Sequence, residues 1–356
     1  MATETAVDTL PSPWGAALGS ALLRSEPEDF AVVELPLVTP SGTGEHLLIR
    51  LRKRGWTTPA AADALARAFG VAKSRVSYAG MKDRHAITEQ SFSIHAPAGD
   101  IPASPTLPEG LGLLAVERHH RKLRRGALRG NRFRLRLRGV EAPPTGVHRR
   151  LAAIMHRGVP NYFGMQRFGA GDGNIAAAEA WFRGERTPKD RRERGLWISA
   201  ARSRVFNAVL AARVADGTWQ RAVSGDRMML DGRRSLFRAA DEEPGVLAAR
   251  LAAGGVHPTG PLPGCDGKLP GDEALPEVEQ RVLAAYQGFV AALGGLGVEA
   301  DRRALRVHIG DMVWHFEAAQ TLVVEFSLPA GAYATTVLGQ VFDLQDGTGQ
   351  VNDNTT

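Results

Sequence analysis

The secondary-structure signals change twice along this 356-residue chain, and no other feature constrains its fold as strongly. Strand patterns rich in β-branched and aliphatic residues recur near both ends, for example in residues 30–35. From about residue 158 the long middle is Ala-rich and shows helical periodicity, with few strand signals. A helical stretch between two mixed segments favours one discontinuous domain with another inserted into it. We therefore predict an α+β fold: residues 1–157 and 308–356 form a mixed α/β domain, and residues 158–307 form a largely helical insert.

Several elements can be placed within this plan. Residues 58–70 are typical of a helix that has Thr58 as its N-cap and ends at a glycine. Short strands are predicted at residues 75–79 and 90–94, and the connection between them is the loop Gly80–Glu89. Further helices are predicted at residues 174–182, 198–215, 277–293 and 332–342.

A strand with two very different faces is predicted at residues 131–140. Apolar and cationic side chains alternate there, which is the pattern of a half-buried strand. The apolar side consists of Phe133, Leu135 and Leu137, and the cationic side, here called the arginine row, consists of Arg132, Arg134, Arg136 and Arg138. The arginine row either lines an RNA-facing surface or is simply the solvated side of the strand.

Positive charge is concentrated in one segment of the chain. Ten of the 44 Lys and Arg residues lie between Arg118 and Arg138, and no acidic residue interrupts them. The rest of the chain has 34 basic and 38 acidic residues, a net charge of −4, against +6 for the whole. Clustered cations on a mildly acidic body favour a polyanionic partner, because they release counterions condensed on a phosphate backbone. A solvated surface run is the alternative.

Composition narrows the setting in which such a chain works. No apolar run reaches the roughly 18 residues that a transmembrane helix needs. Residues 1–13 lack the basic start and apolar core of a secretory signal. The single cysteine, Cys265, excludes an internal disulfide and a thiolate metal cluster. These features favour a reducing, cytoplasmic compartment.

Taken alone, the acid between two bases in Lys82-Asp83-Arg84 is typical of a surface turn. It occurs, however, with other motifs that match in order and spacing, and together they resemble the TruD family of tRNA pseudouridine synthases over nearly the whole chain. The matching runs are Pro27–Val33 (PEDFAVV), Ala79–Ala86 (AGMKDRHA), Gly126–Phe133 (GALRGNRF), Gly158–Gly169 (GVPNYFGMQRFG), Ala200–Ser203 (AARS) and Leu328–Thr335 (LPAGAYAT).

The resemblance implies a reaction and a catalytic residue. Enzymes of this family detach uracil from ribose at N1 and rejoin it through C5, usually at tRNA position 13, without a redox, phosphate or metal cofactor. Asp83 stands at the family's catalytic aspartate, which attacks the sugar at C1′ or assists a glycal route. The target nucleotide must leave the base stack. By resemblance, residues 1–157 and 308–356 are the catalytic domain and residues 158–307 the inserted TRUD domain.

Five further residues match family positions that contact the substrate. Asn131 orients the carboxylate, reads a uracil edge, or simply ends a turn after Gly130. Phe133 either stacks on the flipped base or belongs to the core, and the same alternatives hold for Phe30 and Tyr333. Arg24 stands where relatives often carry Lys as the basic partner of the aspartate.

The expected partner is tRNA, and the chain is expected to act as a monomer. The predicted RNA-binding patch consists of Arg121, Lys122, Arg124, Arg125 and Arg129. In Gly158–Gly169, the side chains of Tyr162, Gln166 and Arg167 either touch RNA or serve tight packing. Two other classes of protein compete with the isomerase: an RNA-binding protein on the same scaffold, and a methyltransferase using Gly169–Gly173 as a cofactor loop, although that spacing is wrong.

Overall fold

The computed structural model describes residues 10–97, 105–164, 167–265 and 274–348, which form two compact units. The large-sheet unit comprises Ala17–Met155 and Ile309–Thr356. The insert unit comprises His156–His308 together with Met1–Ala16. This division rests on contacts alone, so the predicted assignment of a role to each domain stays a prediction.

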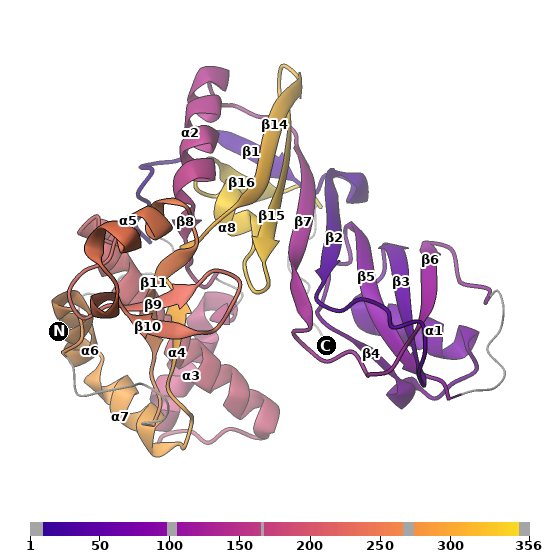
Figure 1. Cartoon of the computed structure of the whole chain (residues 1–356), viewed down its shortest axis with the longest axis horizontal. Helices are drawn as coiled ribbons and strands as arrows, with labels where there is room; N and C mark the ends of the chain where they lie inside the picture. Colours follow the sequence, from indigo (N-terminus) through magenta and orange to yellow (C-terminus); the bar gives the residue numbers. More distant parts are fainter. Residues whose placement is uncertain (1–9, 98–104, 165–166, 266–273, 349–356) are drawn as a thin grey trace. The chain divides into compact units, whose positions relative to one another are not determined.

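An eight-stranded sheet organises the large-sheet unit (Figure 1). Its order is β14-β15-β7-β2-β5-β3-β6, with β4 paired to β5. All neighbours are antiparallel except β2 and β5, which run parallel. The strands are β2 Phe30–Pro36, β3 His46–Arg54, β4 Val76–Tyr78, β5 Ile87–His95, β6 Leu111–His119, β7 Leu128–Leu137, β14 Gly310–Ala318 and β15 Thr321–Pro329.

The alternating segment became a central strand, as predicted. In β7 the side chains of Phe133, Leu135 and Leu137 are buried, and the strand pairs with β2 on one side and β15 on the other. Strand β6 was not predicted. Its apolar residues include Leu114 and Val116, which are exposed, so no clear alternation marks this edge strand.

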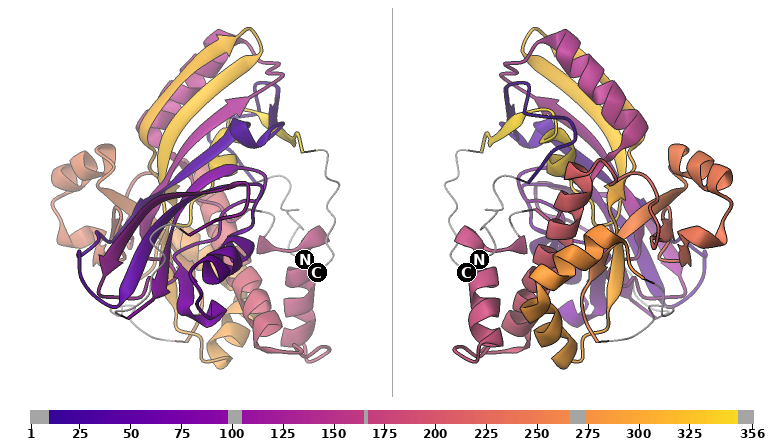
Figure 2. Two further views of the ribbon diagram at one scale, coloured as in Figure 1. Left: turned by 90° about the vertical axis from the view of Figure 1, so that its right-hand side faces the viewer. Right: turned by 90° about the vertical axis from the view of Figure 1, so that its left-hand side faces the viewer.

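Helices pack against parts of this sheet. Helix α1, Thr58–Ala68, covers the buried face of β3 and β5 through Ala62 and Leu65. Helix α2, Pro144–Arg157, lies along the β14–β15 hairpin (Figure 2), and its His148 contacts Trp314 and Phe316.

Two helices of the large-sheet unit begin or end at residues other than those predicted. The N-cap of α1 is Thr57, whose hydroxyl accepts from the Ala60 N–H, and Thr58 is already helical. The helix predicted at 332–342 is shorter: α8 covers Ala334–Leu338. The chain then enters β16, Asp343–Asp346, which pairs in parallel with β1, Ser20–Leu23.

The insert unit is less helical than predicted, because it also contains a four-stranded sheet of order β10-β9-β11-β12. The central strand β11, Val256–Leu262, contains two prolines and a glycine, which are poor strand formers, so its sequence gives little strand signal. The other strands of that sheet are β9 Arg227–Leu230, β10 Leu236–Arg238 and β12 Asp301–Ala304. The insert unit also contains β8 Val159–Pro160 and β13 Arg306–Val307.

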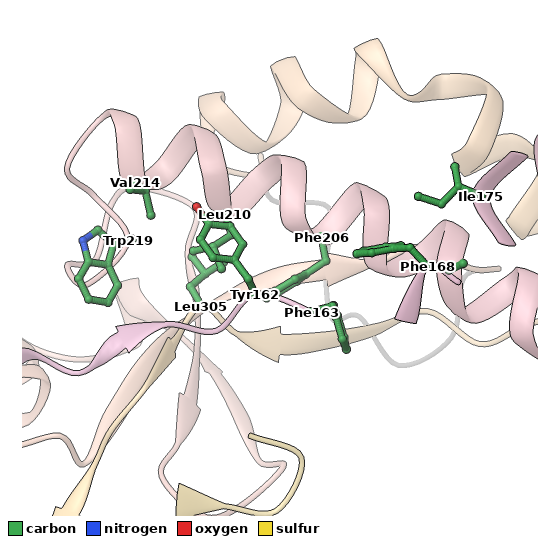
Figure 3. Close-up of a cluster of buried hydrophobic side chains, with 10 residues drawn as sticks. Tyr162, Phe163, Phe168, Ile175, Phe206, Leu210, Val214, Trp219 and Leu305 are labelled. Carbon is green, nitrogen blue, oxygen red and sulfur yellow. The ribbon is translucent and has the colours of Figure 1, made fainter. Parts of the chain in front are cut away.

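Five α-helices accompany this sheet in the described part of the insert unit: α3 Gly173–Phe182, α4 Arg191–Ala215, α5 Pro244–Ala252, α6 Glu277–Ala285 and α7 Gln287–Gly295. The single helix predicted at 277–293 is therefore two helices that meet at Tyr286. The long helix α4 supplies Phe206 and Leu210 to a cluster that also buries Trp219 (Figure 3). No helix in the described ranges is long and apolar enough to cross a membrane.

A buried ion pair ties α4 to the chain that follows it. The Arg213 guanidinium donates to both oxygens of Asp226 at 2.8 and 2.9 Å, and also to the carbonyls of Thr218 and Arg221. Both charged side chains are buried. Removing one partner would leave the other charge without compensation in the interior.

We therefore expect Arg213→Met to lower the free energy of unfolding by about 3–5 kcal/mol. Urea denaturation followed by circular dichroism measures the loss. The matched control is Arg183→Met, which breaks a solvent-exposed pair with Glu185 and should change the free energy of unfolding far less, because water screens that pair. Equal losses in the two variants would contradict the prediction.

Candidate active site

The Asp83 loop, which in the structure spans residues 80–86 because β5 already begins at Ile87, is fixed at its backbone by buried polar side chains. The Lys82 N–H donates to the Thr58 hydroxyl at 2.9 Å, and Gln90 Nε2 donates to the Gly80 carbonyl at 2.6 Å. Thr58 and Gln90 also bond to each other, at 3.1 Å, and both are buried. Thr58 is therefore free of the capping role predicted for it, and instead holds the residue directly before Asp83.

Lys53 provides the strongest anchor of this loop. Its ammonium donates to the Asp83 carbonyl at 2.7 Å and to the Trp56 carbonyl at 2.8 Å, and its side chain is fully buried. Burial lowers the pKa of Lys53 from 10.5 to about 8, although the negative charge of Asp83 acts in the opposite direction. A buried cation thus lies directly beneath the backbone of Asp83.

Lys82 and Glu34 form a second buried attachment. Lys82 Nζ lies 2.9 Å from Glu34 Oε2, and Glu34 Oε1 accepts from the Ser91 N–H at 3.1 Å. Both charged side chains are almost inaccessible to solvent. With Lys82 pointing inward, the next side chain points outward: Asp83 is 56% exposed. The loop therefore presents a solvent-accessible carboxylate on a backbone fixed from inside.

Arg24 is the cation beside that carboxylate. Its Nη2 lies 3.4 Å from Asp83 Oδ2 and its Nη1 lies 3.3 Å from Asp346 Oδ2. The guanidinium carbon is 4.3 Å from the centre of the Phe30 ring. Arg24 has φ of 63°, an uncommon conformation for a residue with a side chain, and such strain is often found at functional sites. The structure thus joins Arg24, Phe30 and Asp83 in one cluster.

Phe30 and Phe133 belong to an aromatic stack inside the sheet. The Phe30 and Phe133 rings meet edge to face at 6.3 Å, and Phe133 stacks on Phe326 at 5.6 Å. All three side chains are buried. Phe30 and Phe133 are therefore core residues of the sheet, and the Arg24 guanidinium also packs on the face of the Phe30 ring.

Asn131 and Tyr333 are not bonded to Asp83 in the described structure. Asn131 lies opposite Glu34 in the pairing of β7 with β2, so it is placed near the Lys82–Glu34 pair. Its Oδ1 is buried and has no hydrogen-bond partner among the described residues. Tyr333 precedes α8 and is 49% exposed, which is unusual for a large aromatic side chain.

The basic segment divides into two kinds of residue. The arginine row is neutralised locally: its members pair with Asp311, Glu325, Glu317 and Asp29, respectively. All five residues of the predicted RNA-binding patch are exposed, and none forms an ion pair with another described residue. Arg125 lies over the Tyr78 ring at 4.1 Å. The uncompensated charge is thus in the loop before β7 and at Arg129, the second residue of β7, rather than in the arginine row.

The Gly158–Gly169 run mainly serves packing. Tyr162 is buried, and its hydroxyl donates to the Pro11 carbonyl at 3.0 Å. Gly158 has φ of 74°, and a Cβ there would lie 2.2 Å from the Val307 carbonyl oxygen. Arg167 is exposed and donates to the Ser199 hydroxyl, whereas Gln166 lies outside the described residues. The glycine cluster at 169–173 precedes α3 and follows no strand directly, unlike a methyltransferase cofactor loop.

The sequence interpretation missed the buried supports of the Asp83 loop. Lys53 continues the buried side of β3 after Ile49 and Leu51, and Glu34 continues the buried side of β2. A charged residue at a core-facing strand position was therefore the available signal. Asp346 was missed because a helix was predicted just before it.

Lys53 should give stability a characteristic pH dependence. Its pKa is about 8 in the folded chain and about 10.5 when unfolded, so above pH 8 the unfolded chain holds more protons. The contribution of Lys53 to the free energy of unfolding therefore rises from pH 8 to pH 10.5. We expect the wild type to gain about 2–3 kcal/mol relative to Lys53→Met between pH 7 and pH 10. Urea denaturation across this range measures the difference, and a constant difference would contradict it.

Comparison with known proteins gives a consistent result. The family model described as tRNA pseudouridine synthase D (TruD) matches residues 18–177 and 190–341. The tRNA pseudouridine synthase D of Xanthomonas axonopodis pv. citri is 44% identical over 357 residues, which cover 95% of each chain. That of Pseudomonas entomophila is also 44% identical and covers 94% of each chain. Among solved structures, a TruD protein of Methanosarcina mazei matches with a TM-score of 0.74 at 23% identity, over 93% of this chain and 95% of that one.

Proposed function

This chain belongs to the TruD family of tRNA pseudouridine synthases, enzymes that isomerise uridine to pseudouridine in tRNA, and we propose that Asp83 is its reacting carboxylate. The observation that carries the proposal is the contrast within the Asp83 loop. Its backbone is held by Lys53, Thr58 and Gln90, while the Asp83 carboxylate remains accessible. A carboxylate held this way can meet a nucleotide without reorganising first.

The reaction itself is balanced without a co-reactant. The bond from ribose C1′ to uracil N1 breaks, a bond from C1′ to C5 forms, the C5 proton leaves, and N1 gains a proton. Asp83 either adds to C1′ in the cleaved state and leaves when C5 attacks, or takes a proton from the ribose C2′ to give a glycal. Arg24 holds the carboxylate through its guanidinium in both routes.

The remaining site residues have distinct proposed roles around the flipped uridine. Tyr333 is the exposed aromatic side chain and offers a surface on which the base can stack. Phe30 and Phe133 form the apolar floor of the site, and Phe30 positions Arg24. The unpartnered Oδ1 of Asn131 can accept a hydrogen bond from a uracil N–H. Position 13 of tRNA is the proposed target.

The proposal extends to the domains and to the setting. Residues 1–157 and 308–356 are the catalytic domain, and residues 158–307 are the TRUD domain that flanks the RNA. Arg121, Lys122, Arg124, Arg125 and Arg129 form the RNA-binding patch, supported by their exposure and by the lack of ion pairs within the described ranges. The enzyme acts as a monomer in the cytoplasm, with no added cofactor.

Asp83→Asn should abolish pseudouridine formation, by at least about a thousandfold, because an amide neither adds to C1′ nor accepts a ribose proton. The backbone bonds of the loop do not involve this side chain, so tRNA affinity should change less than about threefold. Product is quantified by mass spectrometry of digested tRNA, and affinity by filter binding. Near-normal product from this variant would remove Asp83 from the mechanism.

Binding of tRNA should weaken steeply with salt, and the patch should account for part of that slope. Each phosphate contact contributes about −0.7 to −0.9 to the slope of log K against log salt concentration. Neutralising Arg124, Arg125 and Arg129 to Gln should therefore make the slope shallower by about 2–3. The matched control is the exposed triple variant Arg67→Gln, Arg75→Gln, Arg149→Gln, which carries the same charge change outside the patch and outside the Asp83 loop. Equal slopes for the two triple variants would place the binding surface elsewhere.

A further inference from the structure

A cavity of about 430 Å³, here called the Tyr78 pocket, lies beside the basic loop in the large-sheet unit. Its walls come from α1, from β4 and from the loop that precedes β7, which lie in one unit of the chain (Figure 1). The apolar part of its lining includes Pro59, Ala62, Val76 and Leu123. Pockets that take small molecules commonly have volumes of about 300–1,000 Å³. The cavity thus has room for more than a phosphate group.

Positive charge dominates the Tyr78 pocket. Lys73, Lys122, Arg124 and Arg125 line it, together with one acid, Asp63. Asp63 is already neutralised by Lys73, with Nζ and Oδ2 2.7 Å apart. Three cations therefore remain without an ion-pair partner among the described residues. Such a pocket attracts an anion.

A flat stacking surface accompanies this charge. The Arg125 guanidinium lies 4.1 Å above the Tyr78 ring, so the ring supports the guanidinium from one side. Arg125 is exposed, so its other side faces solvent. Unpaired RNA bases stack on arginine planes as well as on aromatic rings. Apolar walls, the supported guanidinium of Arg125 and the two further cations, Lys122 and Arg124, match the parts of a nucleotide.

We propose that the Tyr78 pocket binds a second nucleotide of the RNA substrate, distinct from the uridine that reacts at Asp83. This inference rests on the proposed tRNA modification. The base stacks on Arg125, while Lys122 and Arg124 hold the neighbouring phosphates. Asp83 follows Tyr78 by five positions, so their Cα atoms are at most about 18 Å apart. One short stretch of RNA can occupy both places.

The pocket is also joined to the Asp83 loop through its walls. The Gly126 N–H, next to Arg125, donates to the Ala79 carbonyl at 2.7 Å, and Ala79 follows the pocket residue Tyr78. Pro59 lines the pocket directly after Thr58, which holds the Lys82 N–H. A nucleotide in the pocket therefore orders the two segments that hold the loop.

Arg125→Lys tests the stacking plane, because it keeps the charge but removes the flat guanidinium. Pseudouridine formation on a tRNA transcript should show a KM raised about tenfold, with kcat within about twofold of the wild type. The matched control is Arg75→Lys, an exposed arginine next to β4 that does not line the pocket, and its KM should be unchanged. Thermal denaturation of each variant checks that the fold is retained.

The double variant Lys122→Gln, Arg124→Gln tests the phosphate contacts against Arg67→Gln, Arg75→Gln, which removes two exposed charges outside the pocket. The pocket pair should lose at least about tenfold in tRNA affinity and the control pair less than threefold. If the pocket pair loses tRNA affinity but Arg125→Lys keeps the wild-type KM, the pocket binds only a phosphate, and the nucleotide assignment is overturned. Equal losses of tRNA affinity in the two double variants would show that the Tyr78 pocket does not bind RNA. If the wild type forms no pseudouridine, the proposed function fails as well, so the two failures are distinguishable.

Discussion

The Lys53 ammonium beneath the Asp83 backbone is the interaction on which the candidate site depends. A lysine stem reaches through the core side of β3, and its charge ends among backbone carbonyls rather than at a carboxylate. Carbonyl dipoles compensate only part of the cost of burying a cation, and the low pKa of Lys53 reflects that cost. The arrangement persists because the surrounding sheet fixes it, and its effect is to hold a loop that would otherwise be a surface turn.

Two buried charged groups thus support one accessible carboxylate. Lys82 turns inward to Glu34, and Lys53 holds the carbonyl of Asp83, so the backbone between them has little freedom. The parallel pairing of β2 with β5 makes this possible, because it brings Glu34 close to the strand that follows the loop. The eight-stranded sheet is in this sense the framework of the candidate site, and the loop carries the accessible carboxylate.

Sequence reasoning predicted Asp83 as the reacting residue but did not predict the side chains that hold its loop. Asp83 was recognised from its motif, and the strand at 131–140 from its alternation, because both signals are local in the sequence. Lys53 and Glu34 were missed because the groups that compensate their burial, the Asp83 carbonyl and the Lys82 ammonium, are distant from them in sequence. Thr58 was assigned the wrong role because Thr57 precedes it and both are good N-caps. The strands of the insert unit were missed because β11 combines proline and glycine with complete burial, and only tertiary pairing makes that a strand.

The sequence showed how much positive charge the segment Arg118–Arg138 carries, but not which of its side chains are neutralised by acids in the folded chain. The four arginines of the arginine row pair with acids at residues 311, 325, 317 and 29, all distant in sequence, so no local pattern reveals their neutralisation.

At position 24, the shape of the arginine side chain matters as well as its positive charge. Its guanidinium lies on the Phe30 ring while two of its nitrogens meet two different carboxylates, those of Asp83 and Asp346. A planar group with separate donors can make these three contacts at once, whereas a lysine ammonium is a single point of charge. The left-handed backbone of Arg24 turns the chain just after β1, and thereby directs the side chain towards Asp83 rather than along the strand. In this chain, arginine therefore links the end of the small β1–β16 sheet to the Asp83 loop, a connection that lysine would make only in part.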